Sequence, residues 1–182
     1  MTTSTTEIPG YLTGTWSIDP VHSNVSFVVR HLGVTRVRGR FTDLAGEIVT
    51  ADDVADSSVT ATMQAASIDT TNQQRDEHVR SADFLDAENH PTLSFRSTGV
   101  RVDGEDYLID GELTLRGVTR PVTLIAELGG FGDGMTEGSK VLGVSARTEI
   151  KRSDFGVGTN IPTAVVSEKV VIELDIEAVR QG

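Results

Sequence analysis

Residues 170–177 read VVIELDIE, and this stretch decides the fold class. Apolar side chains alternate along it with a mainly polar set: Val170, Ile172, Leu174 and Ile176 on one side, and Val171, Glu173, Asp175 and Glu177 on the other. Successive side chains of a β-strand point to opposite faces, so the pattern predicts a strand with one buried and one solvated face.

The same alternation continues outward from this stretch through most of the chain. Strands are expected, for example, at residues 24–30, 58–68, 106–115 and 122–128, the last followed by a loop at 129–139 with five glycines. The Asp103-Gly104 pair is a hairpin signal. About eight such strands joined mainly by hairpins suit an antiparallel meander with one dry face, which can close into a barrel.

The size of the predicted inward side chains bears on what fills this barrel. Many are small, among them Ala61, Ala65, Ala126 and Ala146, and the chain has only six Phe, two Tyr and one Trp. Small inward residues leave space, which favours a hollow barrel that can hold one small ligand. A β-sandwich with a packed core stays open as the alternative.

One stretch, residues 69–91 (DTTNQQRDEHVRSADFLDAENHP), breaks the β-pattern. Thr71 followed by Gln74 fits a capping box at a helix start, and Pro91 forces an end. We therefore expect a short helix and loop near residues 70–90 that closes one end of the barrel. Phe84 and Leu85 should point inward, and the polar residues should act as caps and gate.

Composition excludes several classes of function. With 27 acidic residues against 16 Lys and Arg, the net charge is −11, which disfavours binding to nucleic acid. The chain has no cysteine and no stretch long enough for an integral membrane helix. The first residues lack the pattern of a secretory signal, so a cytoplasmic location is expected. Residues 1–12 are predicted to be a disordered extension, and residues 13–180 a single domain.

Charged side chains offer few candidates for chemistry. Arg36, Arg38 and Arg40 share one strand face, where they either hold an anionic head group or form a solvated outer face. His22 and His31 are nine residues apart, which puts them on opposite faces if they share one strand. Neither a nucleophile elbow nor a phosphate-binding loop is present. No catalytic or metal-binding residues are predicted.

Several motifs together carry a resemblance to a known family: TWSIDPVHS at 15–23, SADFLD at 81–86, HPTLSF at 90–95, GELTLRGVTRPV at 111–122 and RSDFG at 152–156. In this order they resemble the YceI-like family of bacterial polyisoprenoid-binding proteins, over about residues 15–178. The resemblance implies a lipocalin-like barrel with an elongated apolar pore and an isoprenoid or similar long-chain amphiphile as ligand. Many relatives are exported, and a homodimer is possible.

The combined prediction is an eight-stranded antiparallel lipocalin-like barrel that binds a polyprenyl phosphate, quinone or similar lipid for storage, transport or sequestration, with no cofactor required. The expected apolar lining is Val25, Phe27, Val29, Phe41, Met63, Phe84, Leu85, Phe95, Leu113 and Leu115. The expected polar mouth is Arg38, Arg75, His78, Asp83 and Asp154. Two alternatives stay open: an enzyme using His78, Asp83 or Asp154 as acid or base, and a packed β-sandwich interaction module.

Overall fold

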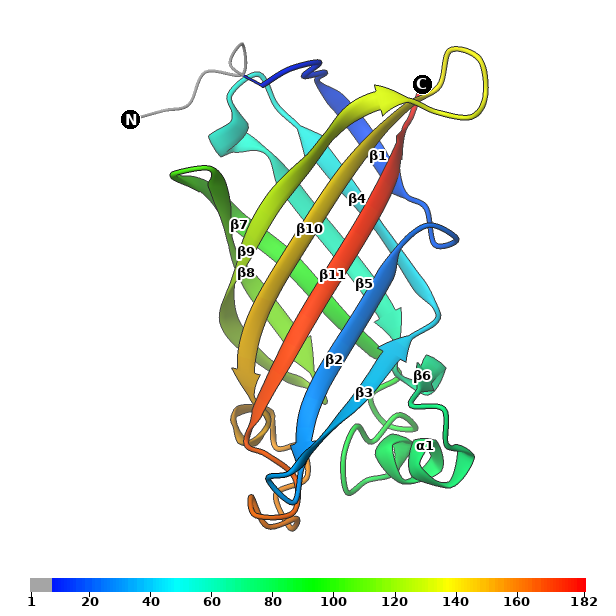
Figure 1. Ribbon diagram of the computed structural model, residues 1–182, viewed down its shortest axis with the longest axis vertical. Coiled ribbons are helices and arrows are strands. Elements are labelled where there is room, and N and C mark those ends of the chain that lie inside the picture. Colours follow the sequence, from blue (N-terminus) through cyan, green and yellow to red (C-terminus); the bar gives the residue numbers. More distant parts are fainter. Residues whose placement is uncertain (1–7) are drawn as a thin grey trace.

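The computed structural model describes residues 8–182 and shows one antiparallel sheet curled into an elongated barrel (Figure 1). Its elements are β1 (Gly14–Ile18), β2 (Asn24–His31), β3 (Thr35–Phe41), β4 (Leu44–Thr50), β5 (Ser58–Gln64), β6 (Ile68–Asp69), α1 (Gln73–Arg80), β7 (Thr92–Asp103), β8 (Asp106–Leu115), β9 (Val118–Asp133), β10 (Lys140–Lys151) and β11 (Lys169–Arg180). Residues 1–7, which hold most of the predicted N-terminal extension, lie outside the described residues. No helix in the described part is long and apolar enough to cross a membrane.

The barrel closes through β1, which pairs with β4 on one edge and with β11 on the other. The closed ring is the predicted eight-stranded antiparallel barrel, in the order β1-β4-β5-β7-β8-β9-β10-β11. Below β1, β2 continues along β11, because Ile18 is in register with Ala178 and Asn24 with Asp175. β3 then pairs with β2, and this ribbon extends the wall toward the lower end in Figure 1.

Two strands differ clearly from the prediction. The strand expected at residues 58–68 ends at Gln64 and gives way to a 3₁₀ turn and β6, and β9, expected at residues 122–128, extends over Val118–Asp133. The prediction assigns the glycines at the C-terminal end of β9 to a loop. Instead, the ladder with β10 shifts register between Gly143 and Val144, where Gly129 lies close to the Gly143 backbone. Glycine permits this close approach of two backbones, so the strand continues through an irregularity that glycine-rich composition alone does not reveal.

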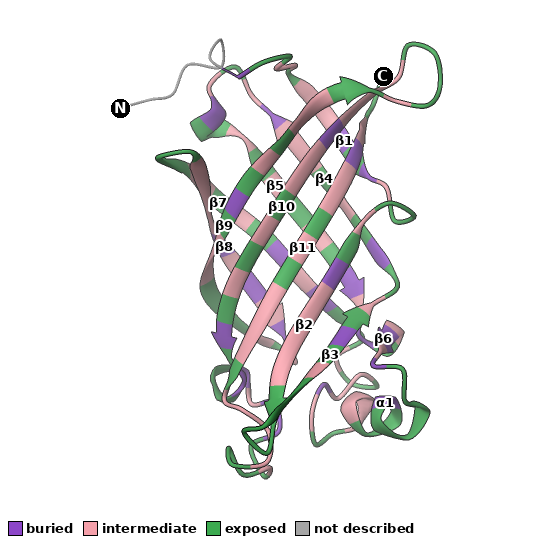
Figure 2. Ribbon diagram, viewed as in Figure 1, coloured by how far each residue is buried: buried purple, intermediate pink, exposed green. Residues whose placement is uncertain are grey.

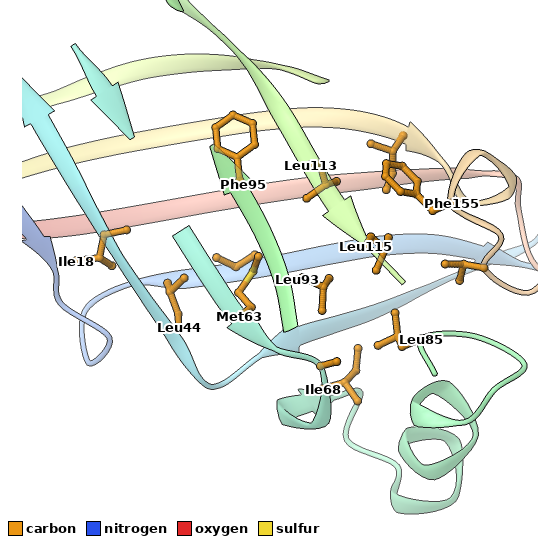
Figure 3. Packing of buried hydrophobic residues seen from close by; sticks show 14 residues of the cluster. Ile18, Leu44, Met63, Ile68, Leu85, Leu93, Phe95, Leu113, Leu115 and Phe155 are labelled. Carbon is orange, nitrogen blue, oxygen red and sulfur yellow. The ribbon is translucent and has the colours of Figure 1, made fainter. Parts of the chain in front are cut away.

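Inward-facing side chains form one large apolar cluster and a smaller one. The large cluster lines the barrel, with Met63, Leu93, Leu113 and Leu115 pointing to a common interior (Figure 3). Many inward apolar residues are nevertheless only partly buried, as the pink segments of Figure 2 show along the central strands. A packed core would bury them fully, so the interior is hollow and the packed-sandwich alternative is wrong.

Aromatic rings lie flat against this inner wall where a facing residue is glycine. Phe27 of β2 is in register with Gly39 of β3, and a Cβ at Gly39 would come within 2.3 Å of the Phe27 ring. A Cβ at Gly111 would likewise come within 2.4 Å of the Phe95 ring, although Gly111 itself is in register with Ser97. The glycines thus let large rings cover the wall without filling the barrel axis.

The helix α1 lies at the lower end, as predicted, but its cap differs from the prediction. The N-cap is Asn72, whose side chain accepts a hydrogen bond from the Arg75 backbone N–H at 3.0 Å. Thr71 has φ of +64°, and its hydroxyl donates to the Thr70 carbonyl, so the expected Thr71–Gln74 capping box does not form. Asn and Thr are both favoured at the N-cap position. The residue type therefore does not decide between Thr71 and Asn72 as the cap of α1.

Candidate ligand-binding cavity

A cavity of about 590 Å³ runs inside the barrel, with walls drawn from every strand of the closed ring. Among the described residues that line it there is no Asp, Glu or Lys, in a chain whose net charge is −11. Volume and lining fall within the range of protein sites for small apolar ligands. Strand alternation contributes to this separation: in β11, Ile172, Leu174 and Ile176 line the cavity, whereas Glu173 and Asp175 between them are exposed on the outer face.

All ten residues predicted as apolar lining are in the cavity wall: Val25, Phe27, Val29, Phe41, Met63, Phe84, Leu85, Phe95, Leu113 and Leu115. Eight of them come from strands. Phe84 and Leu85 come from the segment after α1, and Leu85 points into the same interior as Leu93 and Leu115 (Figure 3). The structure thus places them where a ligand would lie, and contact with a ligand stays a prediction.

The five polar residues predicted for the mouth separate into two groups. Arg75 and His78 line the cavity, and Asp83 supports His78 through a 3.0 Å hydrogen bond. Hydrogen bonds from His78 and Asn160 lower the pKa of Asp83 below its usual value. Asp83 itself is exposed and does not line the cavity.

Arg38 and Asp154 lie away from the cavity. Arg38 is exposed on the outer face of β3, since its neighbours Val37 and Gly39 take the inward positions. Asp154 is exposed in a short 3₁₀ turn whose inward position is filled by buried Phe155. The spacing of Arg36, Arg38 and Arg40 predicted that they share one face of a strand. It did not decide whether that face points into the barrel or outward.

The lower end of the cavity is basic. His31, Arg75 and His78 line it and are exposed, so the cavity meets solvent beside them. Arg75 is held by hydrogen bonds from Nε to the Thr70 hydroxyl at 2.8 Å and from Nη2 to the Thr70 carbonyl at 2.6 Å. Buried Asp76 accepts bonds from the Thr70 backbone and hydroxyl, which fixes Thr70 in turn.

A further basic residue at this end, Arg152, was missed by sequence reasoning. It is buried, and its guanidinium donates to five backbone carbonyls, those of Val157, Gly158, Ile161, Val166 and Ser167. The side chain therefore organises the loop between β10 and β11. The signal available was weak: an arginine at a strand end, followed by an uncharged stretch at residues 155–167.

Two segments meet to close this end of the barrel. The Gly158 backbone N–H donates to the Asp83 carbonyl at 2.8 Å. Arg116 bridges the same segments, because its Nη1 donates to the carbonyls of both Phe84 and Gly156. The predicted helix-and-loop closure is thus present, and the loop after β10 shares it.

The opposite end of the cavity is lined by apolar and uncharged side chains. Trp16, Leu142 and Ala178 form a buried cluster there, and Trp16 Nε1 donates to the Thr50 hydroxyl at 2.9 Å. Tyr11 and Phe131 also line the cavity at this end, and burial raises the pKa of Tyr11. The two ends of the cavity therefore differ in chemistry, one aromatic and one basic.

In the described part of the chain, one group of three side chains has metal-ligand geometry: Asp19, His22 and Glu177, with ligand atoms within 4.8 Å of one another. His22 lies in the turn between β1 and β2, so the single-strand argument about His22 and His31 does not apply. A 2.7 Å hydrogen bond to Asp19 raises the pKa of His22. His78 and His90 pair separately with Asp83 and Asp86.

A closed antiparallel barrel around an apolar cavity, with a few polar groups at one end, defines a structural class, the lipocalin-like β-barrels. Within that class, the chain belongs to the YceI-like domain family, which it matches over residues 16–178. Protein YceI of Escherichia coli O17:K52:H18 (strain UMN026 / ExPEC) is 40% identical over 161 residues, covering 88% of this chain and 83% of that protein.

Solved structures show the same fold. The YCEI protein of Campylobacter jejuni has a TM-score of 0.76 at 31% identity, over 84% of this chain and 90% of that one. A polyisoprenoid binding domain from Saccharophagus degradans, implicated in plant cell wall breakdown, has a TM-score of 0.66 at 19% identity, over 93% of this chain and 100% of that one. The latter likeness shows the fold alone.

Proposed function

We propose that this protein binds one long-chain isoprenoid-type lipid inside the barrel and stores, transports or sequesters it. The observation that carries the proposal is the cavity: about 590 Å³, apolar along its length and lined without a carboxylate or lysine in the described residues. Family membership and the polyisoprenoid-binding neighbour support the same class of ligand.

Burial of the tail supplies the binding free energy. Removing apolar surface from water stabilises a complex by about 25 cal/mol per Å², before the cost of association. Inner-wall residues such as Phe27, Leu124 and Ile172 are only partly buried by the protein itself. A lipid tail would cover them, so protein and ligand lose apolar surface together.

We propose that the polar head of the lipid lies at the lower end of the cavity. Arg75, His78 and His31 are exposed there and line the cavity, so they can donate to a phosphate or a quinone oxygen. The tail then extends toward Trp16 and Phe131. Polyprenyl phosphates and quinones both fit this division into a basic end and an apolar end.

Paired substitutions on β2 test the proposal. Phe27 lines the cavity, whereas Val28 belongs to the opposite face of the same strand. Phe27→Asp should weaken uptake of added polyprenyl phosphate or quinone more than about tenfold, because a charge would lie beside the tail. Val28→Asp should bind like the unaltered protein.

Uptake is measured by fluorescence quenching or by mass spectrometry of the complex. Equal uptake by the two variants would contradict an interior site. His78→Ala should leave lipid capacity largely intact, whereas an enzyme using His78 would lose turnover.

A further inference from the structure

The lower end of the molecule carries an exposed apolar tip beside the cavity mouth. We define the lower pole as residues 31–35, the turn between β2 and β3, together with residues 156–166, and Figure 1 shows both at the bottom of the barrel. Neither segment contains Asp, Glu, Lys or Arg. Leu32 is 56% exposed and Val34 is 77% exposed. The Leu32 N–H donates to the Val165 carbonyl at 2.9 Å, which joins the two segments.

The backbone conformation of Leu32 supports a functional reason for the exposure of its side chain. Its φ is +55°, in the left-handed region that favours Gly, Asn and Asp over a branched aliphatic residue. A leucine here costs folding stability and gains little packing in return. Such an outlier points to a use for the side chain outside the folded chain itself.

Positive charge borders the lower pole on the outer face of β2 and β3. Arg30 and Arg36 are directly opposite each other in the ladder, and Arg38 lies two residues farther along; all three are exposed. In the described structure no carboxylate is within ion-pair distance of these three, whereas Arg40 pairs with Asp69 at 3.5 Å. Like charges directly opposite are unfavourable unless an anion lies between them.

We infer that the lower pole docks on an anionic lipid bilayer. Leu32 and Val34 would enter the interface while Arg30, Arg36 and Arg38 contact lipid phosphates, the combination of apolar insertion and basic residues that holds peripheral proteins on membranes. A nucleic acid or an acidic protein would engage the arginines but leave the two aliphatic side chains in water.

The inference rests on the proposed function, because docking gives the lipid a route into the barrel. His31, Val165 and Val166 belong to the lower pole and also line the cavity. A bilayer in contact with the pole would therefore lie beside the cavity mouth. The net charge of −11 opposes binding through any other face, so docking fixes the orientation of the barrel.

Flotation with vesicles of phosphatidylcholine containing about 30% phosphatidylglycerol tests the inference on the full chain. The protein should float with these vesicles, and raised salt should release it. Leu32→Asn combined with Val34→Asp should lower vesicle binding more than about tenfold, while Asn suits the backbone at position 32 and keeps the fold. Arg36→Glu should act in the same direction.

Matched controls exist elsewhere on the surface. Val21 and Met135 are 81% and 98% exposed, so Val21→Asp and Met135→Asp repeat the loss of an exposed apolar side chain away from the pole. Arg147→Glu makes the same charge reversal as Arg36→Glu, at an exposed position of β10. All three should bind vesicles like the unaltered protein, and equal losses in these variants would overturn the inference.

Lipid uptake separates this inference from the proposed function. The Leu32→Asn/Val34→Asp variant should accept polyprenyl phosphate added from solution normally, but take it up from vesicles more slowly than the unaltered protein. If the unaltered protein takes up lipid from solution and does not float with vesicles, docking is wrong and the proposed function stands. If it takes up no lipid by either route, the proposed function fails.

Discussion

A single buried side chain, Arg152, orders the loop that helps to close the cavity. Its guanidinium donates to five backbone carbonyls beside an apolar interior, and of these the Gly158 carbonyl also accepts from the Ile161 N–H. Arginine suits this role because its donors spread in a fixed plane, whereas a lysine ammonium is a compact point charge. Arg152 therefore stabilises the loop at the cavity mouth. All three of its guanidinium nitrogens already donate to backbone carbonyls.

Arg152→Ala should lower the free energy of unfolding by about 3 kcal/mol, since it leaves several buried acceptors unpaired. Arg152→Lys should restore little of this loss. Urea denaturation measures both, with Arg147→Ala on the exposed face of β10 as the control. A lysine variant as stable as the original protein would contradict the role given to the planar group.

At the scale of the element, the sequence correctly predicted the helix α1 but placed its N-cap one residue too early. The break in alternation at residues 69–91 predicted a helix that closes one end, and α1 lies there. The cap is one residue away from the predicted one, because Thr71 adopts a positive φ that no spacing rule encodes.

The cap assignment makes a direct prediction about α1. Asn72→Ala should destabilise the first turn by about 1 kcal/mol, because the Arg75 N–H loses its acceptor. Thr71→Gly should leave the helix as stable or more so, since glycine adopts a positive φ without strain. Hydrogen exchange of the amides in Gln73–Arg80 measures the two effects, and the reverse ranking would restore the Thr71 cap.

Strand elements show where sequence reasoning is strong and where it fails. Alternation in VVIELDIE assigned inner and outer faces correctly, because burial on one face of a strand imposes that period directly. It could not assign Arg38 to the outside of the barrel before the sheet curvature was known. Nor could it find Arg152, whose partners are backbone atoms with no sequence signature.

At the scale of the whole molecule, the barrel is hollow and its two ends differ. One end is lined by Tyr11, Phe131 and neighbouring apolar residues. The other end, which α1 and the loop after β10 partly close, is basic and meets solvent beside His31, Arg75 and His78. None of the described residues that line the cavity is acidic, although the net charge of the chain is −11. This arrangement is what an amphiphile needs, a long apolar path with a polar terminus.

Native mass spectrometry of the purified protein, before and after extraction with organic solvent, tests the central claim most directly. We predict a mass excess that corresponds to about one long-chain lipid per chain, lost on extraction and regained on addition of polyprenyl phosphate or quinone. A single mass equal to that of the bare chain, unchanged by extraction and by added lipid, would contradict the account.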